Sequence, residues 1–179
     1  MPAVAGPDIQ LLPFRRRPTG VYKTGHYGAA LLVYAPVGYL LLAVDPALAV
    51  FSGAGSVALA RLPDCDLRIP FLDHRGVTHT LAFLAVVVAA LGGAGYAVSG
   101  AVETSPLRAA GLAAVAAAVG VGSHLLADAL TPAGVPLLWP LSGRRVSLDV
   151  VTASNPLANY GLLALGTAAC LAVGSLAAP

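Results

Sequence analysis

The sequence predicts an all-α fold, a polytopic integral membrane helical bundle with about five transmembrane helices. Of its 179 residues, 58% are hydrophobic and 10% are charged, whereas a soluble domain carries about 25% charged residues. The mean hydropathy is +0.82, and the charged residues are missing from long intervals. This composition excludes an ordinary soluble enzyme and a disordered chain. A net charge of +2 gives no indication of a nucleic-acid partner.

The charge-free intervals define the expected helices. Asp, Glu, Lys and Arg are absent from 24–44, 46–60, 76–102, 109–127 and 150–179. A span needs roughly 17–25 mostly apolar residues, so we expect spans near 26–44, 80–100, 108–130 and 157–178. The interval 46–60 is shorter, and is either a thin or tilted span or a segment that enters the membrane and returns. We expect 1–23 to be a loose cytoplasmic tail and 24–179 a single helical membrane domain, with motif-bearing loops at 61–79 and 131–156.

The distribution of basic residues favours five crossings. If all five segments cross, the tail and the loops 61–79 and 131–156 share one side. That side then carries nine Lys and Arg residues, against Arg108 on the other. This bias satisfies the positive-inside rule and predicts a multi-pass protein of the cell membrane with a cytoplasmic N-terminus. A cleaved signal peptide is disfavoured because the apolar run after Tyr27 is longer than a usual signal-peptide core.

Histidine and aspartate gather near the predicted cytoplasmic side, which holds all four histidines and five of the seven aspartates. His124 and Asp128 are four residues apart on a predicted helix, so they share a face with their Cβ atoms about 5–6 Å apart. That spacing suits two ligands of one metal ion. An ionisable residue inside a membrane helix normally faces the bundle interior with a partner, so a His–Asp hydrogen bond that ties helices together is the alternative.

Two further groups lie in the loop 61–79. Asp64 and Asp66 flank Cys65 after a proline, and in an extended segment residues two apart point the same way, so both carboxylates would address one site. Helix capping or ion pairs with Arg61 and Arg68 are the alternative.

His74 and His79 bracket Arg75 and Gly76. The glycine permits a close turn, and the arginine could bind an anionic oxygen through two hydrogen bonds. Histidines five apart occur in zinc sites, whereas in an interfacial loop Arg75 would instead meet lipid phosphates. Since imidazoles and carboxylates from three segments converge on one membrane face, we expect a divalent cation with mixed N/O ligands, Zn²⁺ first, with Mn²⁺ or Fe²⁺ as alternatives.

Taken together, the motifs resemble the YdjM-like family of membrane-bound metal-dependent hydrolases. The resemblance rests on Pro63-Asp64-Cys65-Asp66, His74-Arg75-Gly76-Val77-Thr78-His79-Thr80, His124-Leu125-Leu126-Ala127-Asp128 and the following Thr131-Pro132-Ala133-Gly134-Val135-Pro136-Leu137-Leu138-Trp139-Pro140. It extends from about His26 to Asn159. The family is distantly similar to zinc-dependent phospholipase C and the S1/P1 nucleases, which are helical enzymes whose zinc ions are held by scattered His and Asp.

The resemblance implies a ligand set. His124 and Asp128 would be ligands, with Asp128 able to bridge two ions, while His79 and one of the two loop aspartates would complete the first ion. His26 would belong to a second ion. Leu67 and Thr80 depart from the family's pattern, and four histidines leave no evident ligands for a third ion, so one or two ions are expected. With His74 added, the candidate metal ligands are His26, Asp64, Asp66, His74, His79, His124 and Asp128.

The function expected from these residues is hydrolysis of a phosphoester or related ester at the cytoplasmic membrane surface, with a phospholipid or another amphiphile as substrate. The cation would lower the pKa of water, whichever of Asp64 and Asp66 does not bind it would accept a proton, and Arg75 would stabilise phosphoryl charge. The alternatives are a non-catalytic metal-binding protein with a scaffold or regulatory role and a cation or proton permease. The scarcity of ionisable residues in the outer half of the spans disfavours the permease.

Overall fold

The computed structural model describes residues 23–177, which form a bundle of α-helices joined by short 3₁₀ helices and loops. The α-helices are α1 (Lys23–Leu42), α2 (Pro46–Leu59), α3 (Leu81–Val98), α4 (Pro106–Ala129) and α5 (Pro156–Ala177), and the 3₁₀ helices are η1 (Pro63–Arg68), η2 (Val77–His79) and η3 (Ser99–Val102). Each predicted segment coincides with a helix to within a few residues. The prediction of an all-α membrane bundle is therefore confirmed, while the predicted tail lies outside the described residues except for Lys23.

Local chemistry explains where the helices begin. Asp45, Thr80 and Ser105 are the N-caps of α2, α3 and α4, and each side chain accepts a hydrogen bond from a backbone N–H of the first turn. Pro46 and Pro106 follow two of these caps, at the position where the missing N–H of proline costs nothing. Thr80 thus both starts α3 and fixes the end of the loop that carries His79.

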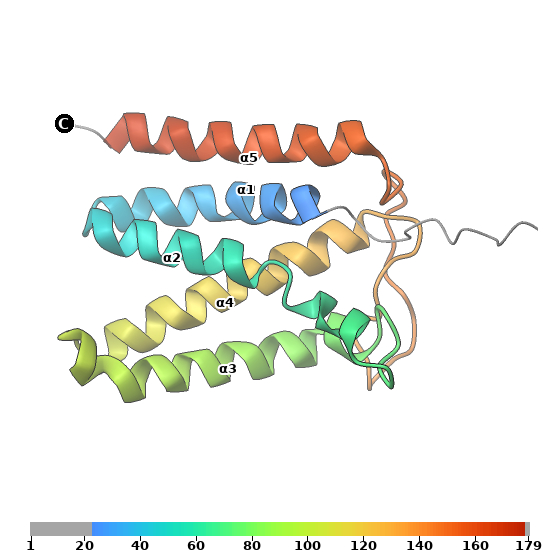
Figure 1. Cartoon of the computed structure of the whole chain (residues 1–179), viewed down its shortest axis with the longest axis horizontal. Helices are drawn as coiled ribbons and strands as arrows, with labels where there is room; N and C mark the ends of the chain where they lie inside the picture. Colours follow the sequence, from blue (N-terminus) through green and yellow to red (C-terminus); the bar gives the residue numbers. More distant parts are fainter. Residues whose placement is uncertain (1–22, 178–179) are drawn as a thin grey trace, which may run out of the picture.

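Successive helices run in opposite directions. The start of α1 and the loops 60–80 and 130–155 lie at one end of the bundle, and the 43–45 turn, η3 and the end of α5 lie at the other (Figure 1). We call the first of these the loop end. The described basic residues at the loop end are Lys23, Arg61, Arg68, Arg75, Arg144 and Arg145, whereas Arg108 lies at the opposite end. This alternation agrees with the five-crossing arrangement, while the side of the membrane that the loop end faces stays a prediction.

Among residues 23–177, four helices are long and apolar enough to cross a membrane, namely α1, α3 together with η3, α4 and α5. Helix α2 has 14 residues, which at 1.5 Å per residue gives about 21 Å. The hydrocarbon core of a bilayer is about 30 Å thick. A complete crossing by α2 therefore stays a prediction.

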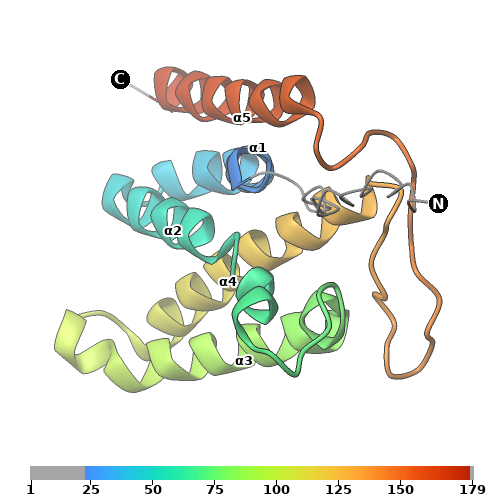
Figure 2. The ribbon, with the colours of Figure 1, turned by 45° about the vertical axis from the view of Figure 1, so that its right-hand side comes forward.

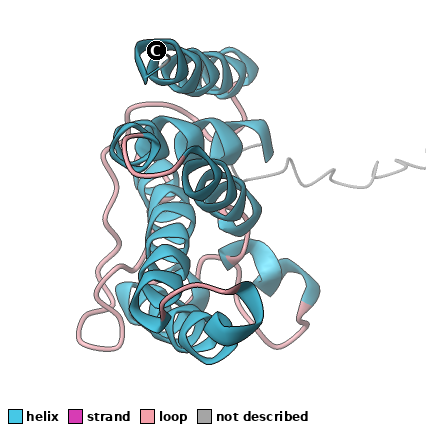
Figure 3. Ribbon diagram, turned by 90° about the vertical axis from the view of Figure 1, so that its left-hand side faces the viewer, coloured by secondary structure: helices cyan, strands magenta, loops and turns pink. Residues whose placement is uncertain are grey.

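Helix α4 is the centre of the bundle and contacts α1, α2 and α3, while α5 packs chiefly on α1. Figures 2 and 3 show α5 and α3 on opposite sides. A Cβ atom added to Gly28 of α1 would lie 2.4 Å from the backbone of Leu162, so glycine permits the close approach of α1 and α5. Towards the loop end the interior becomes polar, because His26, Ser123, His124 and Asp128 are all buried there.

Candidate metal centre

The last turns of α4 supply two buried side chains on one face, His124 and Asp128, which are 0% and 1% exposed. The Nδ1 atom of His124 lies 2.8 Å from the carbonyl oxygen of Ala60. A carbonyl only accepts hydrogen bonds, so Nδ1 carries the proton and Nε2 keeps a free lone pair. The Oδ2 atom of Asp128 lies 3.4 Å from that Nε2.

His79 presents its ring to the same point from η2. Its Nδ1 lies 3.0 Å from Oγ1 of Thr78 and 3.3 Å from Oδ2 of Asp66. The Thr78 hydroxyl donates its own proton to Asp66, so both neighbours of Nδ1 accept and the ring proton resides there. The free Nε2 of His79 lies 3.1 Å from Nε2 of His124 and 3.4 Å from Oδ2 of Asp128.

The two aspartates of the loop 61–79 point in different directions. The expectation of an extended segment is wrong here, because residues 63–68 form the 3₁₀ helix η1. Three residues per turn place side chains two apart about 240° from each other, so Asp64 and Asp66 diverge. The Oδ1 atom of Asp64 lies 3.7 Å from Nε2 of His124 and 4.0 Å from Nε2 of His79, while Asp66 turns to the far side of the His79 ring.

Ligand atoms of four residues therefore gather here. Those of His79, His124 and Asp128 lie 3.1 to 3.4 Å from one another, and Oδ1 of Asp64 lies 3.7 and 4.0 Å from the two Nε2 atoms. Ligands at about 2.0–2.2 Å from a tetrahedral Zn²⁺ lie roughly 3.3–3.6 Å apart. His79, His124 and Asp128 thus fit three ligands of a divalent cation, and Asp64 is the next carboxylate beside them.

The remaining predicted histidines lie beside this group. The ring of His26 stacks on His124 with centroids 3.8 Å apart, and its buried Nδ1 has no hydrogen-bond partner among the described residues. His26 forms a second group of potential ligands with Asp64 and His124, and His74 forms a third with Asp64 and His79. Because Asp64 belongs to both of these groups, it is the side chain best placed to be shared between two ions.

Asp66 holds the histidines in place. Its Oδ1 lies 3.1 Å from Nδ1 of His74, and its Oδ2 accepts hydrogen bonds from the backbone N–H of Arg75 and from the Thr78 hydroxyl. With both oxygens engaged and 2% of the residue exposed, Asp66 orients the His79 ring. A carboxylate behind a ligating histidine fixes its tautomer and raises its basicity.

Arg75 performs the equivalent task for Asp128. Its guanidinium donates from Nη2 to Oδ1 of Asp128 at 2.6 Å and from Nη1 to Oγ1 of Thr131 at 3.0 Å. The residue is 3% exposed and adopts a left-handed backbone conformation with φ 59°. The following Gly76 is required by the turn, since an added Cβ would lie 2.7 Å from the Asp73 carbonyl oxygen.

The charges of the cluster call for a cation. The cluster holds three carboxylates, from Asp64, Asp66 and Asp128, against two guanidinium groups, that of Arg75 on Asp128 and that of Arg61 at 3.8 Å from Asp64. Burial lowers the pKa of His79 below its ordinary value and outweighs the opposing influence of Asp128, so its imidazole stays neutral. An excess of buried negative charge costs several kcal/mol, which a divalent cation would offset.

Cys65 takes no part in the cluster as a thiolate. Burial raises the pKa of its thiol, and the neighbouring charges of Asp66 and Asp64 add to that rise. A neutral thiol is a poor metal ligand.

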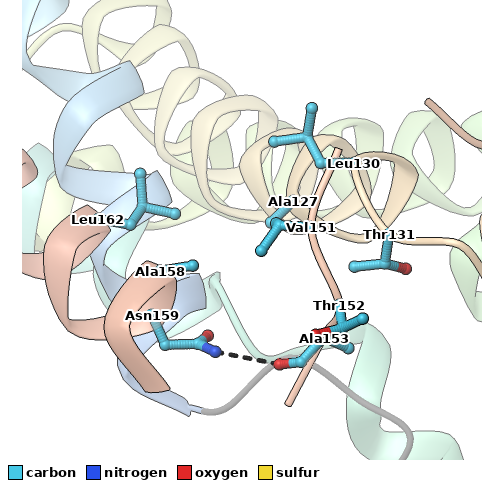
Figure 4. Close-up of a pocket in the computed structure, with 9 residues that line it drawn as sticks. All are labelled: Ala127, Leu130, Thr131, Val151, Thr152, Ala153, Ala158, Asn159 and Leu162. Carbon is cyan, nitrogen blue, oxygen red and sulfur yellow. Dashed lines mark hydrogen bonds between the residues drawn. The ribbon is translucent and has the colours of Figure 1, made fainter. Parts of the chain in front are cut away.

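The loop 131–156 closes the other side of Asp128. It returns on itself through a bridge between Val135 and Val146 and leads into α5, whose start leaves a small cavity of about 50 Å³ against α4 (Figure 4). Asn159 donates to the Ala153 carbonyl oxygen at 3.0 Å there. The mostly apolar lining and the volume, which suits little more than water, make this cavity a packing feature of the bundle.

Three contributors to the centre were missed by the sequence analysis. The Thr78 hydroxyl donates to Asp66, and the Thr131 hydroxyl accepts from Arg75. Both residues lie inside the motifs on which the family resemblance rests. Their place inside these motifs was the one feature of the sequence that could have identified them. The Ala60 carbonyl, which binds His124, had no signal, because every residue offers a carbonyl.

Fold and cluster together define a multi-pass helical membrane protein with a candidate metal centre at one end of the bundle. The family described as YdjM inner membrane protein matches residues 22–178, and the chain belongs to that family. Inner membrane protein YdjM of Escherichia coli (strain K12) and its namesake in Shigella flexneri are each 50% identical over 48 residues, which is 26% of this chain and 24% of the relative. The aligned stretch thus spans about a quarter of either relative. No solved structure matches the chain.

Proposed function

We propose that the protein is a membrane-bound hydrolase that uses a divalent cation to cleave a phosphoester or related ester at the membrane surface. The observation that supports this most is the convergence of two deprotonated Nε2 atoms, from His79 and His124, on the carboxylates of Asp64 and Asp128. Zn²⁺ suits this mixed donor set best. When bound, it would supply Lewis acidity and lower the pKa of water.

Asp64 is the ligand that solvent and substrate can reach. Its side chain is 13% exposed, against 0% for His79 and His124 and 1% for Asp128. It also borders a cavity of about 300 Å³. In the hydrolase, His79, His124 and Asp128 would hold the ion and leave a fourth position open. We therefore assign to Asp64, which lies beside them, the orientation of the attacking water and the acceptance of its proton.

The other two predicted participants act through the ligands. Asp66 holds the His79 ring, and Arg75 holds Asp128 through its Nη2 atom. With both of its Nη atoms engaged, Arg75 is better placed to keep Asp128 in position than to reach a phosphoryl group. The sequence predicted that Arg75 stabilises the developing phosphoryl charge directly. We propose instead that Arg75 positions Asp128.

Exposed apolar side chains on the loops support an amphiphilic substrate. Leu67 is 60% exposed, Phe71 84% and Leu141 91%, and all three lie in the loops that carry or cover the cluster. Such residues at the end of a membrane bundle insert into the interface between lipid headgroups and acyl chains. A substrate that shares this interface, such as a phospholipid, is the natural choice.

The test is turnover by the purified full-length chain in detergent after equilibration with Zn²⁺, on a soluble phosphodiester and on phospholipids. We expect Asp64→Asn to reduce turnover by about 10²-fold or more, as loss of proton transfer does. Asp45→Asn is the matched control, because Asp45 caps α2 at the opposite end and Asn caps equally well. Zinc-loaded wild type that hydrolyses none of these substrates would contradict the proposal.

A structural metal site is the second candidate function. If Asp64 also binds the ion, the four protein ligands resemble the closed sites in which a cation stabilises a fold, whereas catalytic sites keep one position open. The ligands come from η1, η2 and α4, so an ion would tie these segments together. Retained zinc, a higher unfolding temperature with the metal and no turnover would favour this function.

A further inference from the structure

A second polar feature of the loop end is the cavity beside Asp64. It has a volume of about 300 Å³ and lies where the last turn of α2 meets η1. Its lining combines the charged residues Arg61, Asp64 and Arg68 with the apolar residues Ala58, Leu59 and Leu62. The volume is at the lower end of the range for small-molecule sites, and the lining is amphipathic.

Among the described residues, the side chains of Arg61 and Arg68 make one contact with a charged group, the pair of Arg61 with Asp64. Nε of Arg61 lies 3.8 Å from Oδ2 of Asp64, beyond hydrogen-bond distance, and this buried atom has no hydrogen-bond partner among residues 23–177. Arg68 is exposed, and no side-chain hydrogen bond or ion pair of Arg68 occurs in the described part of the chain. Planar guanidinium groups bind phosphate oxygens through paired hydrogen bonds, so both side chains are available for an anion.

Asp64 connects this cavity with the candidate metal centre. Its Oδ1 faces Nε2 of His124 at 3.7 Å, while its Oδ2 faces Arg61. An anion held by Arg61 and Arg68 would therefore lie beside the least buried ligand of the centre. Leu59 is the last residue of the apolar helix α2, and Leu62 directly precedes η1, so the apolar part of the lining continues the apolar end of this helix.

We propose that this cavity binds the phosphate group of a membrane amphiphile. Arg61 and Arg68 donate hydrogen bonds to its non-bridging oxygens, and Leu59 and Leu62 contact its apolar part. The inference rests on the proposed function, for which it names the group that carries the scissile bond. Free inorganic phosphate offers the same oxygens, so the experiment compares the two sources.

The experiment is a calorimetric titration of the zinc-loaded full-length chain in a neutral detergent. One series uses dihexanoyl phosphatidic acid and the other uses inorganic phosphate. We expect Arg61→Gln and Arg68→Gln each to weaken binding of the lipid about tenfold, because each removes charge-assisted hydrogen bonds. Arg144→Gln is the matched control, since Arg144 is an exposed arginine of the loop 131–156, and its Kd should stay within about twofold of the wild type.

Each outcome decides the inference. Wild-type affinity for the lipid in both variants would overturn it, and so would inorganic phosphate that binds as tightly as the lipid. Zinc content is measured in every variant. If Arg61→Gln loses metal, the result for Arg68→Gln decides, because no hydrogen bond or ion pair joins Arg68 to a ligand of the centre within the described residues.

Binding and turnover separate this inference from the proposed function. Arginine-dependent binding of the lipid without hydrolysis by the wild type would support the cavity and contradict the hydrolase. Hydrolysis of the lipid with an unchanged KM in both glutamine variants would support the hydrolase and overturn the cavity.

Discussion

The Nε2 atoms of His79 and His124 face each other at 3.1 Å, and in the tautomers set by their Nδ1 partners neither neutral ring has a proton on this atom. The Nδ1 proton of His124 is donated to the Ala60 carbonyl, and that of His79 to Thr78 and Asp66. Two lone pairs at this separation repel each other unless a positive charge lies between or beside them. The facing rings are therefore the strongest structural indication of a cation site in the described part of the chain.

Asp66→Asn tests whether the residues that hydrogen-bond to the metal ligands support metal binding. Since Asp66 orients His79 without facing the centre, we expect its amide variant to lower zinc affinity by 10–100-fold while the fold is retained. Competition with a chromogenic chelator measures the Kd. Asp73→Asn is the matched control, because Asp73 is exposed in the same loop. Equal zinc affinity in Asp66→Asn and the wild type would mean that Asp66 does not support the site.

Arg75→Gln tests the buried ion pair with Asp128. Removal of one partner leaves the other charge buried and unpaired, which costs about 3–5 kcal/mol. We expect the metal-free variant to lose free energy of unfolding on this scale and zinc to restore part of it, because the cation then compensates Asp128. Denaturant titration followed by the fluorescence of Trp139, the single tryptophan, measures the change. If Arg75→Gln loses no more free energy of unfolding than Arg144→Gln, to within about 0.5 kcal/mol, the ion pair of Arg75 with Asp128 does not stabilise the fold.

The sequence predicted the fold better than it predicted the roles of the individual residues in the site. Charge-free intervals identify the helices because a bilayer excludes charge whatever the tertiary packing. The spacing of His124 and Asp128 placed them on one face because both lie in one regular helix. The roles of Asp64 and Asp66 could not be predicted, because they depend on whether residues 63–68 are extended or form a 3₁₀ helix.

The pairing of residues that are far apart in the chain could not be predicted from the sequence either. Arg75 and Asp128 are 53 residues apart, and Arg75 could serve an anionic substrate or a carboxylate of its own chain with the same chemistry. The choice depends on the left-handed turn at Arg75, which directs the side chain inward. Nothing in the pattern of residue types specifies that direction.

Cys65 offers a check on the electrostatics of η1. Burial and the charges of Asp66 and Asp64 raise the pKa of its thiol, so less of it is thiolate at neutral pH and alkylation should be slow. In a Cys170→Ala background, we expect the rate of reaction with iodoacetamide to rise with pH and to level off at a higher pH than for N-acetylcysteine measured alongside. A plateau at a lower pH than that of the small thiol would show that η1 does not concentrate negative charge around Cys65.

The orientation in the membrane follows from the basic residues and can be tested separately. We expect the loop end to face the cytoplasm, because Arg61, Arg68 and Arg75 lie there and Arg108 lies opposite. In a chain without its native cysteines, Ser142→Cys should react with a membrane-impermeant maleimide only after permeabilisation, and Thr104→Cys should react in intact cells. The reverse pattern, with Ser142→Cys reactive in intact cells and Thr104→Cys protected, would mean that α2 does not cross or that the bundle is inverted.

The most direct measurement is the metal content of the purified full-length chain after equilibration with Zn²⁺ and removal of loosely bound ions, with His124→Ala and Asp45→Asn in parallel. We predict one or two zinc ions per chain in the wild type and in Asp45→Asn, and a loss of affinity of at least about tenfold in His124→Ala. Folded wild type that retains no divalent cation, or His124→Ala that retains as much as the wild type, would contradict the account.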